Sequence, residues 1–184
     1  MSRRVRRVVL VIAALAIAGT ATAMLLVRPD LESARDRVDA RWGPLRPPLS
    51  ARYTALANVA QALHAAGAAD RAVTKDLDAA IARWSKLALR GPAHTDAGVE
   101  ATTANELEAL ARRVKANYLA SPRLMANPGL GPAIQAFDGA FVPAPAIKAY
   151  NQAVRNYEDA RAGIIKGLVA GVLGYESRPV LFVA

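Results

Sequence analysis

The sequence has no cysteine, two histidines and few aromatic residues. The absence of cysteine excludes disulfides, thiolate metal sites and cysteine nucleophiles together. Aromatic residues make up 5% of the chain, and the β-branched and aromatic runs that are typical of strands are nearly absent. Alanine and aliphatic residues supply most of the 53% hydrophobic content, and alanine is the best helix former because it loses no side-chain entropy. The composition therefore predicts an all-α protein, and 184 residues hold one ordinary domain with an additional segment.

Positive charge is not clustered outside the N-terminal region. The formal net charge is +9, from 24 Lys and Arg residues against 15 Asp and Glu residues. Five of the arginines flank a hydrophobic run near the N-terminus, and the other 19 basic residues exceed the acidic ones by only four. Binding to nucleic-acid phosphates needs clustered Arg and Lys. We therefore expect no nucleic-acid partner.

One uncharged run of bilayer length is present, over residues 8–27. As a helix it would span about 30 Å, the thickness of a hydrocarbon core. Residues 1–7 are basic, whereas acids and bases mix after the run, so the positive-inside rule places the N-terminus in the cytoplasm and the rest of the chain outside the cytoplasmic membrane. The predicted single-pass anchor makes the lipid bilayer a partner. Its membrane-facing apolar residues include Val8, Leu10, Ile12, Leu15, Ile17, Leu25, Leu26 and Val27.

The same run has a second interpretation. Ala21, Thr22 and Ala23 form the small-x-small pattern of a signal-peptidase site. Apolar residues continue over 24–27, beyond that site, which favours an uncleaved signal anchor. The alternative is a secreted helical protein that is released by cleavage after Ala23.

Apolar residues at helical spacing predict helices through the rest of the chain. The pattern covers 31–42 and resumes over 49–89, where Gly67 would weaken one long helix. A Gly-Pro pair and a Pro-Pro pair lie between the two stretches, at 43–48. Proline removes an amide donor and clashes with the preceding turn. Whether these prolines bend the helix or end it stays open at this point.

Two loops rich in glycine and proline, at 91–98 and 119–145, divide the remainder. A third helix lies between them, and a final helix follows the second loop as far as Gly174. A short extra helix over 134–137 fits within the second loop. The predicted fold is therefore all-α, with a single N-terminal transmembrane helix followed by an antiparallel bundle of three long helices.

Side chains at catalytic or metal-binding spacing are not found in the sequence. His64 and His94 have no carboxylate or second histidine three or four residues away, the spacing of a helical metal site. Glu106 and Glu108 are two residues apart and so point to different faces of a helix. We expect Glu158 to be solvated. Nucleophile, phosphate-loop and dinucleotide motifs are missing, so we expect no cofactor, no metal and no enzymatic activity.

A glycine series falls in the last apolar stretch, over 162–174. Gly163, Gly167 and Gly171 recur every four residues, and the stretch has one charged residue, Lys166. Small residues at this spacing let another helix approach closely. We expect that helix to belong to the chain's own bundle, and contact with a second copy or a membrane surface is the alternative.

The final helix contains residues that resemble a family signature. The segment AYNQAVRNY resembles the YNxxVxxY signature of the LemA family, and a Gly-Tyr pair further on is similar to that family's Gly-aromatic ending. Other residues fall at spacings similar to its first and middle bundle helices, whereas an Ile-Ile pair stands where the family usually has Phe-Pro. The matching positions are Trp42, Arg52, Asn58, Asn105, Leu107, Tyr150, Asn151, Val154, Tyr157, Gly174 and Tyr175.

The resemblance implies a single membrane anchor and a long antiparallel bundle of coiled-coil type, with the domain over 31–176 and a tail over 177–184. LemA proteins have no agreed enzymatic activity, and their best-supported roles are membrane-associated or structural. The resemblance thus implies an envelope scaffold or interaction module, whose partner is a second copy or another envelope protein. The alternative is an extracytoplasmic domain that binds a ligand or acts as an enzyme in a cleft between helices.

The polar residues of these helices are expected to be structural. An asparagine on a packed helix face usually forms a hydrogen bond that fixes the register of its neighbours. For Asn58, Tyr150, Asn151 and Tyr157 we therefore expect structural hydrogen bonds rather than ligand contacts.

Overall fold

The computed structural model describes residues 25–90 and 96–183, and every regular element in these ranges is helical. The all-α fold class that composition predicts is therefore confirmed. The chain first forms a helical stretch over 25–42, called here the 25–42 helix. It is followed by η1 (Gly43–Leu45), α2 (Arg46–Ala65), α3 (Ala72–Arg90), α4 (Ala97–Ala120), α5 (Pro122–Met125), α6 (Leu130–Gly139), α7 (Ala144–Arg161) and α8 (Ile164–Val172).

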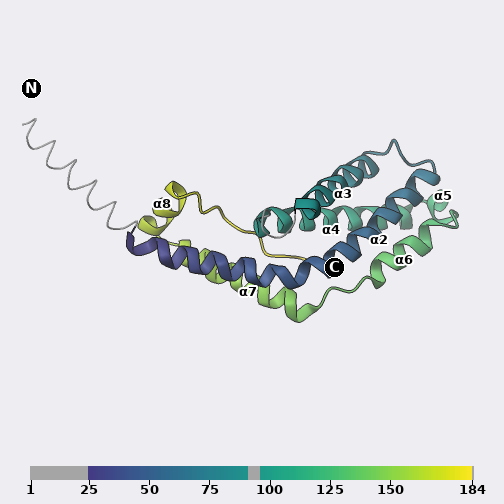
Figure 1. Cartoon of the computed structure of the whole chain (residues 1–184). Helices are drawn as coiled ribbons and strands as arrows, with labels where there is room; N and C mark the ends of the chain where they lie inside the picture. Colours follow the sequence, from purple (N-terminus) through teal and green to yellow (C-terminus); the bar gives the residue numbers. More distant parts are fainter. Residues whose placement is uncertain (1–24, 91–95, 184) are drawn as a thin grey trace, which may run out of the picture.

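The helices form an elongated molecule with two ends (Figure 1). At one end the 25–42 helix lies beside α7, and the rings of Trp42 and Tyr150 meet with their centroids 4.9 Å apart. At the other end α2 packs against α3 and α6, and α3 packs against α4. Residues 175–183 return from α8 to the middle of the molecule, where the chain ends (Figure 1).

The prolines at 43–48 bend the chain without ending its helical course. Gly43–Leu45 tighten into a 3₁₀ turn, and Trp42, Leu45 and Arg46 all keep right-handed helical dihedral angles. Pro44 lies in the first turn of η1, and Pro47 lies in the first turn of α2. A first-turn amide has no partner within the helix, so proline loses little there. Figure 1 shows the two helical stretches meeting at an angle at this point.

The single helix predicted over 49–89 is wrong, because the chain reverses at Gly67. The φ of Gly67 is +70°, a left-handed conformation that glycine adopts without steric cost. The amide of Ala68 donates to Leu63 O at 2.9 Å, and that of Gly67 donates to His64 O at 3.0 Å, the pair of bonds that closes a Schellman motif. As a result α2 and α3 form a helical hairpin.

The final helix is also divided. Its first part, α7, ends at Arg161, and Gly163, with a φ of +100°, lets the chain change direction before α8. The predicted short helix over 134–137 is confirmed and lies within the longer α6.

A buried ion pair joins three helices at the centre of the α2 end. Arg52 of α2 and Glu108 of α4 are 4% and 1% exposed, and their side chains form two hydrogen bonds of 2.7 and 3.0 Å. The guanidinium also donates to Phe137 O at 3.2 Å and to Ala140 O at 3.0 Å, at the end of α6. It lies 4.0 Å from the centroid of the Phe137 ring. Arg52 therefore fixes α4 and α6 relative to α2.

Within residues 25–90 and 96–183, no helix combines the length and the apolar character needed to cross a membrane. The predicted anchor residues Val8, Leu10, Ile12, Leu15 and Ile17 lie outside the described ranges. Leu25 and Leu26 are exposed, and Val27 packs partly against the core.

We predict that Arg52→Met lowers the free energy of unfolding by about 3–5 kcal/mol, because it leaves the Glu108 carboxylate buried without its main partner. The double variant Arg52→Met/Glu108→Leu should recover at least about half of this loss, since it removes the uncompensated charge as well. Urea unfolding of the full chain in detergent micelles, followed by far-UV circular dichroism, measures both. A double variant as unstable as the single one would contradict this account.

Candidate interaction site around the C-terminal strap

Residues 175–183, called here the strap, are extended and belong to no regular element. They follow the turn at Gly174, which ends α8 through a hydrogen bond from the Tyr175 amide to Ala170 O at 2.9 Å. An extended segment cannot satisfy its own backbone groups, so these must find partners elsewhere. In the strap they find side chains of α7 and α4.

Two tyrosines of the predicted signature bind the strap from α7. The hydroxyl of Tyr157 donates to Glu176 O at 2.9 Å, and that of Tyr150 donates to Pro179 O at 3.0 Å. The two lie seven residues apart and therefore on one face of the helix, so they meet the strap at successive points. Burial raises the pKa of both hydroxyls, and at Tyr150 it outweighs the nearby Arg178 charge, so each stays protonated and donates.

Two asparagines bind the last part of the strap as a neighbouring strand would. Asn151 of α7 accepts from the Leu181 amide at 2.7 Å and donates to Leu181 O at 2.9 Å. Asn105 of α4 accepts from the Phe182 amide at 2.9 Å and donates to Val180 O at 2.7 Å. A side-chain amide offers the same donor and acceptor as a peptide group. The asparagines therefore hold the backbone, while the side chain of Leu181 is buried.

Arg178 is the most buried charged residue of the strap, with a side chain 4% exposed. Its guanidinium pairs with Asp39 of the 25–42 helix and, at 2.9 Å, with Asp96 at the start of α4. Burial by itself would lower the pKa of Arg178, but the hydrogen bond and the negative charge of Asp39, with that of Asp96, raise it. The strap, the 25–42 helix and α4 are thus tied together through one side chain.

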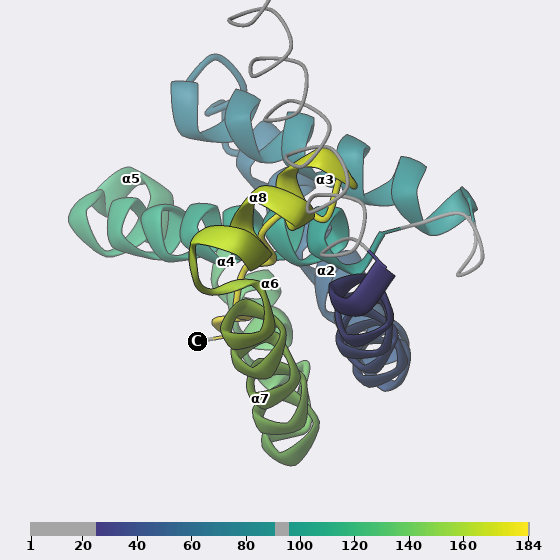
Figure 2. The ribbon, with the colours of Figure 1, turned by 90° about the vertical axis from the view of Figure 1, so that its left-hand side faces the viewer.

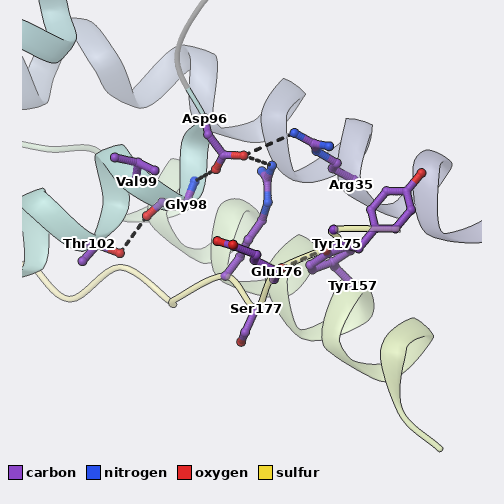
Figure 3. A pocket seen from close by; sticks show the side chains of 11 residues that line it. Arg35, Asp96, Gly98, Val99, Thr102, Tyr157, Tyr175, Glu176 and Ser177 are labelled. Carbon is purple, nitrogen blue, oxygen red and sulfur yellow. Dashed lines mark hydrogen bonds and ion pairs between the residues drawn. The ribbon is translucent and has the colours of Figure 1, made fainter. Parts of the chain in front are cut away.

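Asp96 has three functions at once, as Figure 3 shows. It is the N-cap of α4, since its Oδ1 accepts from the Gly98 amide at 2.6 Å. Its Oδ2 binds both Arg178 and, at 3.3 Å, Arg35. A Cβ on Gly98 would lie 2.9 Å from Asp96 Oδ1 and 3.2 Å from Arg178 Cγ, so a larger residue would displace this arrangement.

A surface hollow of about 240 Å³ lies where these groups meet. Its wall includes Gly174 and the start of the strap over 175–178, together with Arg35, Asp96 and Thr102 (Figure 3). Arg35 and Arg178 in the wall both bind Asp96, and the Thr102 hydroxyl donates to Gly98 O at 2.8 Å. Beside this hollow, the side chains of α7 and α4 hold the strap in place through its backbone groups.

The remaining signature positions have structural roles or lie in solvent. The indole N–H of Trp42 donates to Glu100, and Leu107 and Val154 are buried in the core. Asn58 is exposed on α2 rather than placed on a packed face, so the prediction of a register-fixing hydrogen bond is wrong for this residue.

Sequence reasoning missed the acidic partners. Asp39 and Asp96 were not among the predicted site residues, and Glu158, expected in solvent, binds the Arg178 amide at 2.8 Å. An N-cap signal did exist for Asp96, since aspartate before an apolar helix often caps it. For Asp39 no comparable signal exists.

The other titratable residues pair across helices. The expectation that Glu106 and Glu108 face different sides is confirmed, because Glu106 pairs with Arg83 whereas Glu108 is buried with Arg52. His64 binds Asp78 at 2.8 Å across the α2–α3 hairpin. His94 lies outside the described residues. In the part of the chain that the structure describes, no three His, Cys, Asp or Glu side chains are placed to hold a metal ion.

Comparisons with models of protein families, with curated proteins and with solved structures gave no match to this chain.

We predict that Arg178→Met loosens the strap. It removes a buried cation whose partners are about two-fifths exposed, so the free energy of unfolding should fall by about 1–3 kcal/mol, less than for a fully buried pair. Limited proteolysis with mass analysis should show earlier cleavage within 175–183. Arg155→Met on α7 is the matched control, because Arg155 is exposed and, among the residues that the structure describes, hydrogen-bonds to Gln152 alone. Equal protection of the strap in both variants would refute its dependence on Arg178.

We also predict that stability falls in alkaline solution. Burial raises the pKa of Tyr53, Tyr150 and Tyr157 above 10.0 in the folded protein. As the pH passes that value, the unfolded chain releases these protons before the folded one, so their contribution is complete below pH 10.0 and is lost above it. Above pH 10.0, the loss of each tyrosine's contribution should make the unfolding free energy fall by about 1.4 kcal/mol per pH unit.

Urea unfolding between neutral and strongly alkaline pH measures this slope. Tyr150→Phe should be less stable at neutral pH, because its hydrogen bond to Pro179 O is lost, and should show a shallower alkaline slope. An unchanged slope in this variant would contradict the assignment.

Proposed function

We propose that this chain is a membrane-anchored, non-enzymatic helical protein of the LemA type, which serves outside the cytoplasmic membrane as an envelope scaffold or interaction module. The observation on which the proposal rests is the uncharged run over 8–27, whose length suits a bilayer. It leads directly into the 25–42 helix, which is packed against α7. An anchor in this position would join the membrane to a rigid element.

The use of the signature side chains supports a structural role. Tyr150, Asn151, Tyr157 and Asn105 bind the backbone of the strap. These bonds join α7 and α4 to the same extended segment. A ligand in the nearby hollow would have to compete with existing ion pairs for Arg178 and Asp96, which favours the scaffold over a binding pocket.

The elongated shape also supports an interaction module (Figure 1). An elongated helical domain offers partners more contact area than a compact bundle with the same number of residues. Its candidate partners are a second copy of the chain and another envelope protein.

We predict that the full chain with a C-terminal tag stays in the membrane pellet after alkaline extraction. Protease added to intact cells or spheroplasts should remove the tag, because the positive-inside rule places the helical domain outside. Release by alkali would contradict the anchor, and a protected tag in an alkali-resistant protein would reverse its orientation. Intact mass then separates the anchor from the secreted alternative, since cleavage after Ala23 would give a chain that starts at Met24.

The scaffold role has its own outcomes in the same membranes. Cross-linking in cells, followed by blue-native electrophoresis, should give species larger than the monomer. A monomer without any cross-linked species, in a protein that remains anchored, would contradict the scaffold role and leave the anchor in place.

A further inference from the structure

The short helix α8 exposes an apolar face. Ile164, Ile165, Leu168 and Val172 are 63–85% exposed, whereas Val169 and Ala170 are buried against the rest of the molecule. Ile164, Leu168 and Val172 recur every four residues and therefore share one side of the helix. Large apolar side chains gathered on one face indicate a surface that another phase or molecule covers.

Over the described residues 25–90 and 96–183, the rest of the chain does not cover this face. A Cβ placed on Gly163 or on Gly171 would meet nothing within 4 Å, and one on Gly167 would meet only Arg161 O at 3.7 Å. The prediction that the glycine series packs against the chain's own helices is therefore wrong in the described structure. Lys166, the only charged residue of α8, is two residues from both Ile164 and Leu168 and so lies away from their face.

Both α8 and the start of the 25–42 helix lie at the same end of the molecule (Figure 1). Figure 2 shows this end facing the viewer. Tyr175, three residues after the end of α8, lines a surface hollow together with Glu32 and Asp36. Glu32 is five residues beyond Val27, or about 7.5 Å along a helix. Leu25 and Leu26, at the end of the uncharged run, are more than 70% exposed. The helix α8 therefore lies beside the point where the proposed anchor meets the helical domain.

A second copy of the chain is a poor occupant for this face. The nine residues of α8 form a helix about 14 Å long. A stable dimer buries about 800 Å² on each partner, which is far more than one face of so short a helix provides. A bilayer needs no such area, because an anchor in the same chain keeps α8 next to the lipid and makes even a weak contact effective.

We propose that α8 lies in the interfacial region of the bilayer, with Ile164, Leu168 and Val172 facing the acyl chains. This inference depends on the proposed anchor, since the anchor brings α8 to the lipid. The bilayer then holds the domain at two places, the anchor and α8, and so sets the direction in which the elongated bundle projects. The remaining α8 surface, with Val169 and Ala170, stays packed on the protein.

The absence of cysteine allows a direct test on the full chain. Leu168→Cys on α8 and Leu119→Cys near the end of α4 give two sites of matched exposure, 66% and 68%. Each is labelled with an environment-sensitive fluorophore and reconstituted into phosphatidylethanolamine–phosphatidylglycerol vesicles that contain nitroxide-labelled lipid. We expect lipid quenching at 168 to exceed that at 119 by at least about twofold. Equal quenching at the two sites would overturn the inference.

A second variant checks the apolar face itself. Here the fluorophore is placed at Val172→Cys, and Ile164 and Leu168 are both replaced by serine. Lipid quenching should then fall to the level of the 119 site. Both replaced side chains are exposed, so the fold should persist. Quenching that survives this change would overturn the role of the face. Quenching by a nitroxide on a second copy at 168, rather than by lipid, would assign the face to a dimer.

Alkaline extraction of the same vesicles separates the two proposals. A chain that resists extraction but shows no lipid quenching at 168 keeps its anchor and loses the α8 contact. A chain that is extracted lacks the anchor, and with it the basis of this inference.

Discussion

The guanidinium of Arg178 holds together three parts of the chain that are far apart in sequence. It lies between Asp39 of the 25–42 helix and Asp96 at the start of α4, and its own segment, the strap, has no regular structure. An extended segment keeps its place only when side chains satisfy its backbone, and here the tyrosines and asparagines of α7 and α4 do so. The placement of the strap, and with it the end of the molecule that contains α8, depends on this group of contacts.

The two ends of the molecule are stabilised by different kinds of interaction. At the α2 end a buried Arg52–Glu108 pair lies inside an apolar core, where its geometry is fixed by carbonyl groups of α6 and by the Phe137 ring. At the other end the ion pairs of Arg178 are partly open to solvent, and neutral side-chain bonds to the strap supplement them. Trp42 connects the two, since its indole binds Glu100 of α4 and its ring meets Tyr150 of α7.

The sequence predicts the helices well and their ends less well. The all-α class, the third helix and the short helix over 134–137 follow from composition and periodicity, which are local properties. The reversal at Gly67 does not, because the apolar stripe continues past it and the turn depends on the contacts that each half finds afterwards. Tyr150, Asn151, Tyr157 and Asn105 could be singled out, but not the segment they bind. Asp39 and Arg178 pair across 139 residues, and no local pattern records such a distance.

The strap also affects the order in which the protein can fold. Its Arg178 is 139 residues from Asp39, and contacts with a large separation in sequence form late because closing a long loop costs entropy. Until Arg178 leaves the ribosome, Asp39 and Asp96 lack the cation that neutralises them. The 25–42 helix and α4 can therefore be joined through Arg178 only after the strap has been synthesised. The arrival of the strap is thus a late step in the assembly of this end of the molecule.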